Sequence, residues 1–572
     1  MARPTKETMD NPASQSEIFN VASLLTEAAA DHPDRVAVIN RRGPDSLGRH
    51  TLTYSGLDRD SSLLGQALAQ GPLRVGDRVV VMVPPGSDFF VVIFGLFKAG
   101  LIPVMVDPGM GLKRMFVCLS ESKPKGMIGV KIAHLASLVM PRYFTGIKHR
   151  VTLGTRLFWG GQSYGQILSA SPETPSNSAP VQPFAPVPTK AHDPAGILFT
   201  SGATGLAKGT VYTHSMFRAQ VSLIKETFGM DEGGIDLATF PLFSLFSTAL
   251  GLTAVIPNMN PTKPGKTDPR KILNALKEEK CTSIFASPAL LGRLSAYATE
   301  NKLTFNSLKR VISAGAPIKP QVALDFAKTM GPDGLLFTPY GATEAMPLTS
   351  IEASEIAEVR GMTEQGFGMC VGRPVSGHKM AVIPISDGPL ASFSETQILP
   401  MGEVGEFVAT GPVVAQSYFE RPKESALSLT QGPDGQIWRR MGDLGWHDAQ
   451  DRMWFCGRKS QRVVSDKSVF FTVSCEAIFN NHPKVRRSAL VGVGPAGHAK
   501  PVMIIEPATK HLSTKAWAEL IEELKALGRI NPRTMAITSF LRYRNFPVDV
   551  RHNAKINREK LAAWATAHPD LK

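Results

Sequence analysis

Short apolar runs alternate with helix-type patterns along most of the chain. Because strands that alternate with helices favour parallel pairing, this order predicts an α/β fold with largely parallel sheets. In such sheets, ligand-binding loops follow the carboxyl ends of strands. The predicted strands are 35–40, 77–83, 102–107, 196–200, 281–286 and 310–315.

The most apolar stretch is FFVVIFGLFKAGLIPVMV at 89–106, and it contains Lys98, Gly100 and Pro103. A charged residue and two helix-breaking residues within so short a segment argue against a membrane span. We interpret the stretch as a buried helix that turns at Gly100 into a short strand.

The pattern changes at three places further along. Residues 171–194 carry seven prolines and predict a loop or connector. Strands with glycine turns near 380–412 predict a β-rich subdomain, and a compact βαβ-like tail follows Gly457. We therefore expect a large N-terminal domain, 1–457, with parallel-sheet α/β subdomains and this β-rich subdomain, and a small α+β C-terminal domain, 458–572.

Composition narrows the class of protein. The formal net charge of +14 would favour an anionic substrate, a membrane face or nucleic acid, but no run of five basic residues occurs. We interpret the charge as a generally basic surface and expect no nucleic-acid partner. The five cysteines form no C-x-x-C pair and fit a reducing compartment. The N-terminus lacks a signal-peptide core, so a cytoplasmic protein without a transmembrane segment is expected.

The stretch TSGATGLAKG at 200–209 directly follows the apolar run GILF. Its glycines let the backbone approach an anion, its hydroxyls donate hydrogen bonds, and its lysine neutralises charge. It is not a Walker A loop, because alanine stands at position 207 where that motif requires glycine. The stretch indicates that a nucleoside triphosphate is bound by another route.

Other stretches follow in a fixed order. TPYGATEA offers an aromatic face, a tight glycine turn, a hydroxyl and a carboxylate, and RRMGDLGWHD places Asp443 in a glycine-flanked turn. From about residue 20 to residue 565, the ordered set resembles the adenylate-forming superfamily of acyl-CoA synthetases, peptide-synthetase adenylation domains and luciferases. The motifs that carry the resemblance are TSGATGLAKG, TPYGATEA (338–345), YFERP (418–422), RRMGDLGWHD (439–448), FCGRKSQRV (455–463) and RHNAKINREKL (551–561).

The resemblance implies ATP and Mg²⁺ as cofactors and a mobile small domain. It assigns the cradle for the β- and γ-phosphates to Thr200, Ser201, Gly202, Thr204, Gly205 and Lys208. It assigns the adenine site to Tyr340, which stacks on the base, with Gly341 beside it and Gly315, Ala316 and Pro317 as the other wall.

The reacting groups are also carried over from the resemblance. Thr343 meets the α-phosphate, and Glu344 holds Mg²⁺, a cation that prefers carboxylate oxygen. Asp443 accepts hydrogen bonds from both ribose hydroxyls, and Arg458 approaches the same ribose. Lys555 reaches in from the small domain and bridges the substrate carboxylate and the α-phosphate.

Departures from the superfamily pattern concern the CoA half-reaction. Ser244 stands where many acyl-CoA synthetases carry a histidine that lines the acyl-pantetheine tunnel. Gln461 occupies the hinge position, and VVSDKSVFFT lacks the glycine used when the small domain swings. The adenylation half of the motif set is complete.

Several strings, among them SAGAP, CVGRPV and RMGDLG, resemble one branch of the superfamily, the olefin-biosynthesis β-lactone synthetases. The implied reaction converts a long-chain 2-alkyl-3-hydroxyalkanoic acid through an acyl-adenylate to a β-lactone, with release of pyrophosphate and AMP. The resemblance to this branch implies that the protein acts in the same pathway as an NADPH-dependent ketone reductase and a β-lactone decarboxylase. The main alternative is a long-chain fatty acyl-CoA synthetase; transfer to a carrier protein and a non-catalytic homologue are weaker hypotheses.

Two questions stay open in the sequence. The apolar positions Phe240, Phe243, Phe246 and Leu250 fit an acyl channel or an ordinary core equally well. No base for the 3-hydroxyl proton is identified. His214 lies near the phosphate loop in sequence, and a structural role is favoured for it.

Overall fold

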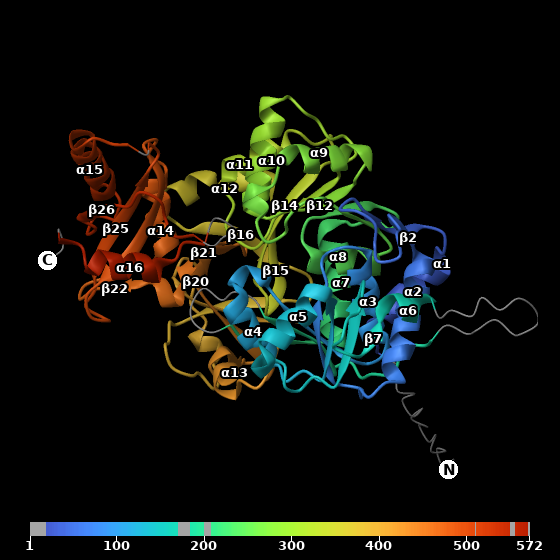
Figure 1. The fold of residues 1–572 in the computed structure, drawn as a ribbon. Helices are drawn as coiled ribbons and strands as arrows, with labels where there is room; N and C mark the ends of the chain where they lie inside the picture. The colour runs from blue at the N-terminus through green and yellow to red at the C-terminus, as the bar shows by residue number, and fades with distance from the viewer. Residues whose placement is uncertain (1–18, 170–183, 200–206, 510, 549–554, 570–572) are drawn as a thin grey trace, which may run out of the picture.

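The computed structural model describes residues 19–169, 184–199, 207–509, 511–548 and 555–569. A seven-stranded sheet forms the N-terminal part, and it is parallel except where the last two strands pair (Figure 1). Its strands, in spatial order, are β7 (Gln162–Ser163), β6 (His149–Leu153), β5 (Gly126–Val130), β3 (Arg78–Met82), β4 (Ile102–Val106), β8 (Pro194–Phe199) and β9 (Gly209–Thr213). The helices in this part are α2 (Tyr54–Ala69), α3 (Ser87–Lys98), α4 (Leu112–Glu121), α5 (Lys131–Val139) and α6 (Tyr164–Ser169).

A 14-stranded sheet forms the centre of the molecule. From β10 to β14 its strands run parallel, and from β14 to β21 they run antiparallel, so the predicted β-rich part continues the same sheet. The spatial order is β17 (Lys379–Ile383), β18 (Gly405–Thr410), β20 (Ile437–His447), β21 (Met453–Arg458), β16 (Met369–Pro374), β15 (Ala345–Glu352), β14 (Leu335–Ala342), β13 (Arg310–Ile312), β12 (Ser283–Phe285), β10 (Ile235–Ala238), β11 (Thr253–Ile256), β1 (Val36–Asn40) and β2 (Thr51–Thr53), with β19 (Leu429–Gln431) beside β20.

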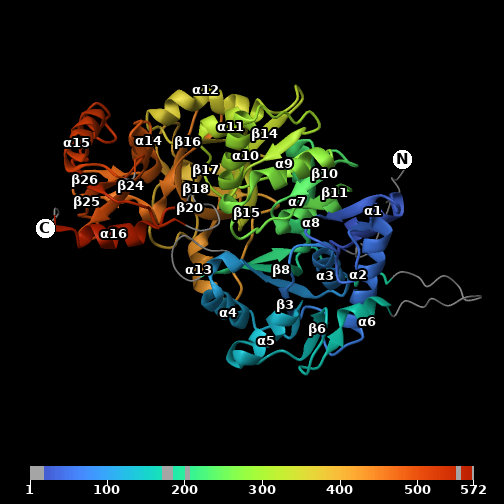
Figure 2. The ribbon, with the colours of Figure 1, turned by 45° about the horizontal axis from the view of Figure 1, so that its top comes forward.

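Helices connect and cover these strands. Helix α7 contacts β8 and β9 of the N-terminal sheet and β15 of the central sheet, so it joins the two layers that Figure 2 shows. The helices of this part are α1 (Ser23–Asp31), α7 (His214–Phe228), α8 (Pro241–Ala249), α9 (Pro269–Glu278), α10 (Pro288–Glu300), α11 (Pro320–Ala327), α12 (Ala353–Glu364) and α13 (Pro422–Ser428).

The C-terminal part has its own three-stranded sheet and two hydrophobic clusters of its own. It docks on the end of α12, where the side chains of Asn481 and Asn531 donate hydrogen bonds to the carbonyls of Glu364 and Gln365, each at 2.9 Å. The predicted small α+β unit is thereby confirmed. Its elements are β22 (Val463–Val464), β23 (Val469–Phe470), α14 (Thr472–Asn480), β24 (Val485–Val493), β25 (Lys500–Pro507), α15 (Thr514–Arg529), β26 (Ser539–Arg542) and α16 (Arg558–Thr566).

All six predicted strand runs contain a strand, because their apolar residues are buried between layers. The stretch 89–106 forms the end of α3 and all of β4, with Gly100 at φ +66° between them, as predicted. Lys98 is buried, and its ammonium pairs with Asp58 at 2.6 Å and donates to Ser62, which offsets the cost of burying its charge. Within the described ranges, no helix is both long enough and apolar enough to span a membrane.

The proline-rich stretch behaves as predicted where it is described. Residues 184–193 contain neither helix nor strand, and β8 begins at Pro194. Residues 171–183 lie outside the described residues.

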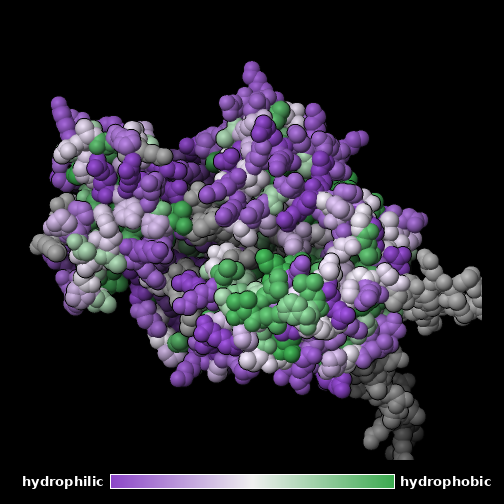
Figure 3. All heavy atoms as spheres, in the orientation of Figure 1, coloured by the Kyte–Doolittle hydropathy of each residue, from purple (hydrophilic) through white to green (hydrophobic). Residues whose placement is uncertain are grey.

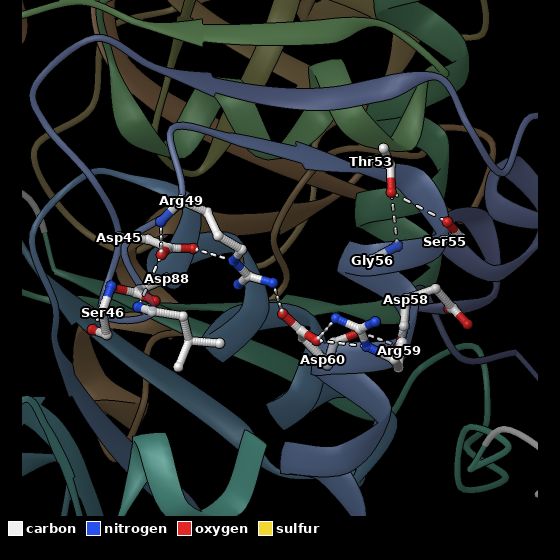
Figure 4. A network of polar contacts seen from close by, with 12 residues as sticks. Asp45, Ser46, Arg49, Thr53, Ser55, Gly56, Asp58, Arg59, Asp60 and Asp88 are labelled. Carbon is white, nitrogen blue, oxygen red and sulfur yellow. Dashed lines mark hydrogen bonds and ion pairs between the residues drawn. The ribbon is translucent and has the colours of Figure 1, made fainter. Parts of the chain in front are cut away.

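A polar network holds the loop before β2 against the N-terminal helices (Figure 4). The guanidinium of Arg49 contacts Asp45 at 2.8 Å and Asp60 of α2 at 2.7 Å. The hydroxyl of Ser46 donates to Asp88 of α3 at 2.6 Å. These paired charges anchor the edge of the central sheet to α2 and α3.

Candidate active site

The hairpin of β14 and β15 carries four of the predicted site residues. Tyr340 and Gly341 lie in β14, and Thr343 and Glu344 form the turn that leads into β15. The sequence predicted a tight turn at the glycine, but Gly341 belongs to the strand and the turn follows two residues later. A side chain at Gly341 would lie 2.3 Å from the carbonyl oxygen of Ala345, so the close pairing of the two strands requires glycine there.

Asp443 lies within β20 and not in a turn, which corrects the sequence prediction. The glycine before it, at φ +66°, deforms the strand without ending it, because β20 continues to pair with β21. In that pairing Asp443 stands directly opposite Arg458, and the Nε of Arg458 lies 3.1 Å from Oδ1 of Asp443. The hydroxyl of Tyr340 donates to Oδ2 of Asp443 at 2.6 Å. The structure therefore brings the three side chains together.

Burial and charge act in opposite directions on this cluster. Burial raises the pKa of the Asp443 carboxyl, and the charge of Arg458 and the Tyr340 hydrogen bond oppose that rise. The negative charge of Asp443 in turn raises the pKa of the Arg458 guanidinium. One oxygen of the Asp443 carboxyl lies against Arg458 and the other against Tyr340. A carboxylate can accept further hydrogen bonds from hydroxyls.

Lys555 comes from the C-terminal part and precedes α16. Its positive charge lowers the pKa of Asp443, whereas the charge of Glu344 raises it. Charges act on one another mainly over short separations, so this effect is consistent with Lys555 facing the side of the molecule where Asp443 and Glu344 lie.

The predicted adenine wall follows the neighbouring strand. Gly315, Ala316 and Pro317 come just after β13, and β13 pairs in parallel with β14, with Ile312 opposite Phe337. Because parallel strands end at the same edge of a sheet, the segment after β13 lies near the C-terminal end of β14, where Tyr340 stands. Gly315 has a φ of +97°, a conformation that favours glycine.

The phosphate loop is described only at its end. Thr200, Ser201, Gly202, Thr204 and Gly205 lie outside the described residues. Lys208 is described, and its ammonium lies over the ring of Tyr418, 4.9 Å from the ring centroid. This is the distance of a cation–π contact.

Three side chains around Glu344 were not assigned a role from sequence. The hydroxyl of Tyr418 donates to Oε1 of Glu344 at 2.6 Å, and the hydroxyl of Tyr212 donates to the carbonyl of Thr343. The buried guanidinium of Arg439 lies 4.7 Å from the centroid of the Tyr418 ring. Tyr418 belongs to the motif YFERP and Arg439 to the motif RRMGDLGWHD. Their separation in the sequence does not predict that the two side chains are in contact.

The chain around Tyr418 joins the phosphate loop to the hairpin turn. The N–H of Phe419 donates to the carbonyl of Gly209 at 2.8 Å, and Gly209 begins β9, directly after Lys208. The N–H of Ala415 donates to the carbonyl of Glu344 at 2.7 Å. Residues 415–419, which we call the brace, therefore contact the end of the phosphate loop and the carboxylate-bearing turn at the same time.

An apolar cavity of about 30 Å³ lies beside the hairpin. Helix α8 contributes Phe243 and Phe246 to its wall, the next residue after the helix contributes Leu250, and β15 contributes Met346. The ring of Phe243 also stacks on Phe285, with 4.1 Å between centroids. The helix is thus core and cavity wall together, and a long acyl chain needs these rings to move, since the cavity has room for little more than one water molecule.

His214 is the first residue of α7, and its ring is buried. The N–H of Val21 donates to its Nδ1 at 3.1 Å, and burial lowers its pKa to about 4. The ring thus holds the chain before α1 against α7, which is the structural role that the sequence favoured.

The described residues form no group of three or more histidine, cysteine, aspartate or glutamate side chains that could hold a metal ion. A Mg²⁺ ion in a nucleotide site commonly takes one or two carboxylates together with phosphate oxygens. The single carboxylate of Glu344, with Oε1 already bonded to Tyr418, fits that donor set.

Two sheets and a docked C-terminal part hold a cluster of aromatic, carboxylate and basic side chains at the strand ends. The chain belongs to the AMP-binding enzyme family, which matches residues 25–419. It is an AMP-forming, ATP-dependent enzyme.

Relatives narrow this class. The olefin beta-lactone synthetase of Xanthomonas campestris pv. campestris is 40% identical over 97% of this chain and 99% of its own. That of Stenotrophomonas maltophilia is 41% identical over 96% of this chain and 98% of its own. The amide bond synthetase McbA of Marinactinospora thermotolerans has the same fold, with a TM-score of 0.77, 19% identity, and coverage of 96% of this chain and 99% of its own.

Proposed function

We propose that the protein is an ATP-dependent β-lactone synthetase in long-chain olefin biosynthesis. The substrate is a long-chain 2-alkyl-3-hydroxyalkanoic acid, and the products are the β-lactone, AMP and pyrophosphate. The observation that carries the proposal is 40% identity to an olefin beta-lactone synthetase across 97% of the chain. It is supported by the adenylation residues, which this chain retains as a full set.

The proposed nucleotide site uses the residues described above. Lys208, with the loop residues before it, takes the β- and γ-phosphates. The ring of Tyr340 stacks on adenine opposite Gly315, Ala316 and Pro317. Asp443 accepts hydrogen bonds from the ribose hydroxyls, and Arg458 keeps that carboxylate ionised and oriented. Mg²⁺, if bound by Glu344 and the phosphates, neutralises charge on the triphosphate.

In the first step, a carboxylate oxygen of the substrate attacks the α-phosphorus and expels pyrophosphate. Two anions must approach each other, so the step needs positive charge at the reacting centre. We assign that charge to Lys555 and contact with the α-phosphate to Thr343. The charge of Lys555 already acts on Asp443 in the docked arrangement, which supports this assignment.

In the second step, the substrate's own 3-hydroxyl attacks the activated carbonyl carbon. A C–O bond forms, the bond to AMP breaks, and the hydroxyl proton leaves. Because nucleophile and carbonyl belong to one molecule, their effective concentration is high, although ring strain opposes closure. His214 is not assigned as the base, because its Nδ1 is bonded to the Val21 N–H.

The alternative, an acyl-CoA synthetase, needs the small domain to swing between two half-reactions. We propose that the boundary between the large and the small domain lies between residues 457 and 458. Arg558 donates to Oε1 of Gln461 at 3.2 Å and pairs with Glu476 at 2.7 Å, so the hinge position is tied to α16. Because all three residues lie in the proposed small domain, this contact does not limit a swing of that domain. The preference over the alternative rests on the 40% identity to an olefin beta-lactone synthetase.

The chemistry of substrate and product implies neighbouring reactions. A 3-hydroxy acid arises by reduction of a 3-keto acid, for which we propose an NADPH-dependent ketone reductase. A β-lactone yields an olefin by loss of CO₂, for which we propose a β-lactone decarboxylase.

The test is incubation of the purified protein with ATP, Mg²⁺ and a synthetic 2-alkyl-3-hydroxy acid in the absence of CoA. We expect β-lactone by NMR and AMP in equal amount. The same acid without its 3-hydroxyl is the matched control, and it should give adenylate but no lactone. Absence of lactone, with a thioester once CoA is added, would instead identify an acyl-CoA synthetase.

A further inference from the structure

Helix α5 is packed with its polar side inward. Its buried residues are Ala133, His134 and Ser137. Ile132 and Val139, which stand about two helical turns apart, are 74% and 78% exposed. A surface helix normally buries its large apolar side chains and exposes its polar ones, so α5 has the reverse arrangement.

The inward polar side chains of α5 make specific contacts with the neighbouring strand β6 and its loop. The ring of His134 is hydrogen-bonded to the carbonyl of Val151 at 3.1 Å, and Arg150 donates to the hydroxyl of Ser137 at 2.9 Å. The ring of Trp159 stacks on His134, with 5.4 Å between centroids. These contacts fix which face of α5 points to solvent.

The apolar surface extends beyond the helix. Trp159 brings the preceding Phe158 to the same part of the surface, and Phe158 is 80% exposed. Figure 3 shows a contiguous hydrophobic area over α5, surrounded by hydrophilic side chains. We call this surface the α5 patch, and it comprises Ile132, Leu138, Val139, Met140, Leu157 and Phe158.

Positive charge concentrates in the same part of the chain. Residues 111–160 contain nine lysines and arginines and one acidic residue, Glu121. More than half of the net charge of +14 therefore lies in fewer than a tenth of the residues. Lys131 begins α5, and Arg142 and Arg156 are exposed close to the patch in sequence. The positive charge is therefore concentrated in this segment, which corrects the interpretation of a generally basic surface.

We propose that the α5 patch docks the protein on an anionic lipid surface. Exposed apolar side chains enter the boundary between headgroups and acyl chains, and the basic residues around them contact anionic headgroups. A protein partner would match the apolar patch equally well, but the excess of positive charge favours a surface with dense negative charge. The inference does not depend on the proposed reaction.

The experiment is vesicle flotation with the full chain. The vesicles contain phosphatidylcholine alone or phosphatidylcholine with phosphatidylglycerol. We expect the wild type to float with the anionic vesicles and to be released as ionic strength rises from about 0.1 M to about 0.5 M. Ile132→Ser with Val139→Ser should lower the partition coefficient at least tenfold, since each loses buried apolar area.

Controls separate docking from folding. Ile530→Ser changes an 80% exposed isoleucine in the C-terminal part and should float like the wild type. Lys131→Glu with Arg156→Glu should weaken binding to anionic vesicles without creating binding to neutral ones. All variants should keep wild-type adenylation without vesicles, since none of these residues lies in the candidate active site.

Three outcomes would overturn the proposal. One is equal flotation with neutral and anionic vesicles, and a second is wild-type flotation of the Ile132→Ser/Val139→Ser variant. The third is a wild-type dimer, detected by light scattering, that this variant converts to a monomer while no form binds vesicles. In that case the patch is an interface between two copies of the chain.

Discussion

Glu344 is the residue on which the contacts of the candidate active site converge. Its carbonyl accepts from the Ala415 N–H, and its carboxylate accepts from the Tyr418 hydroxyl. Neither partner lies within 70 residues of it in the chain. The position of this single carboxylate therefore depends on the brace as much as on its own hairpin.

The first prediction concerns the charge of this side chain. Glu344→Gln keeps the shape but replaces an anionic oxygen with a neutral amide, which holds a hard cation less well. We expect the Mg²⁺ concentration for half-maximal adenylation to rise at least tenfold. The measurement is pyrophosphate release as a function of Mg²⁺. Wild-type activity at limiting Mg²⁺ would contradict the assigned role.

The second prediction concerns the orientation of that carboxylate. Tyr418→Phe removes the hydrogen bond to Glu344 but keeps the ring that contacts Lys208 and Arg439. A hydrogen bond to a charged group contributes about 1.5–3 kcal/mol, so we expect a rise of about tenfold in the half-saturating Mg²⁺ concentration.

A merely structural role would give a different result for Tyr418. Tyr418→Leu serves as the comparison, because it also removes the cation–π contacts and should raise the KM for ATP as well. If Tyr418→Phe lowers the melting temperature but leaves the Mg²⁺ dependence unchanged, the hydroxyl does not position Glu344.

At the scale of elements, α8 and the β14–β15 hairpin enclose the apolar cavity. The helix was open to two interpretations from its sequence, an acyl channel or an ordinary core. Its rings pack against each other and against Phe285, yet they also face the cavity beside the hairpin. Both interpretations describe part of the helix.

The third prediction separates these two roles. Phe246→Ala widens the cavity, and we expect the ratio of kcat/KM for longer over shorter acids to rise about tenfold, the effect of one or two methylenes in an apolar pocket. Phe305→Ala is the matched control, because Phe305 is buried in another cluster and stacks on Phe326. It should cost stability and leave the chain-length profile unchanged. An identical profile for both variants would make α8 simple core.

At the scale of the whole molecule, docking of the C-terminal part decides whether the site is complete. Contacts at Asn481, Asn531 and Arg533 hold that part on the segment after α12. In this arrangement the charge of Lys555 reaches Asp443. The proposed reacting centre therefore combines residues more than 100 positions apart in the chain.

The fourth prediction tests that assembly. Lys555→Ala should slow adenylation by a factor of about 100 or more, since it removes a positive charge that acts on the transition state. The dissociation constant for ATP should change by less than about threefold, because the proposed nucleotide contacts other than Arg458 lie in the proposed large domain. Lys560→Ala, on the exposed surface of α16, is the matched control. Unchanged turnover of Lys555→Ala would refute the assigned role.

Local signals made much of the fold predictable. Apolar runs of four to eight residues predicted six strands, because burial on both faces demands continuous apolar sequence in a parallel sheet. The helix-to-strand turn at Gly100 was also predictable, because a glycine at φ +66° ends a helix without strain. The sequence did not predict that the β-rich part and the parallel strands form one continuous sheet. The periodicity of a strand does not encode which strand it pairs with.

The sequence by itself determined the alternation of strands and helices, because each element is specified by residues close together in the chain, and the order of its motifs indicated the class of chemistry. Tertiary structure alone decided that Asp443 lies in a strand opposite Arg458, that Tyr418 and Tyr212 hold the Thr343–Glu344 turn, and that α5 exposes Ile132 and Val139. The physical reason is that each of these depends on which distant surfaces exclude water from one another, and periodicity specifies an apolar face without specifying what covers it.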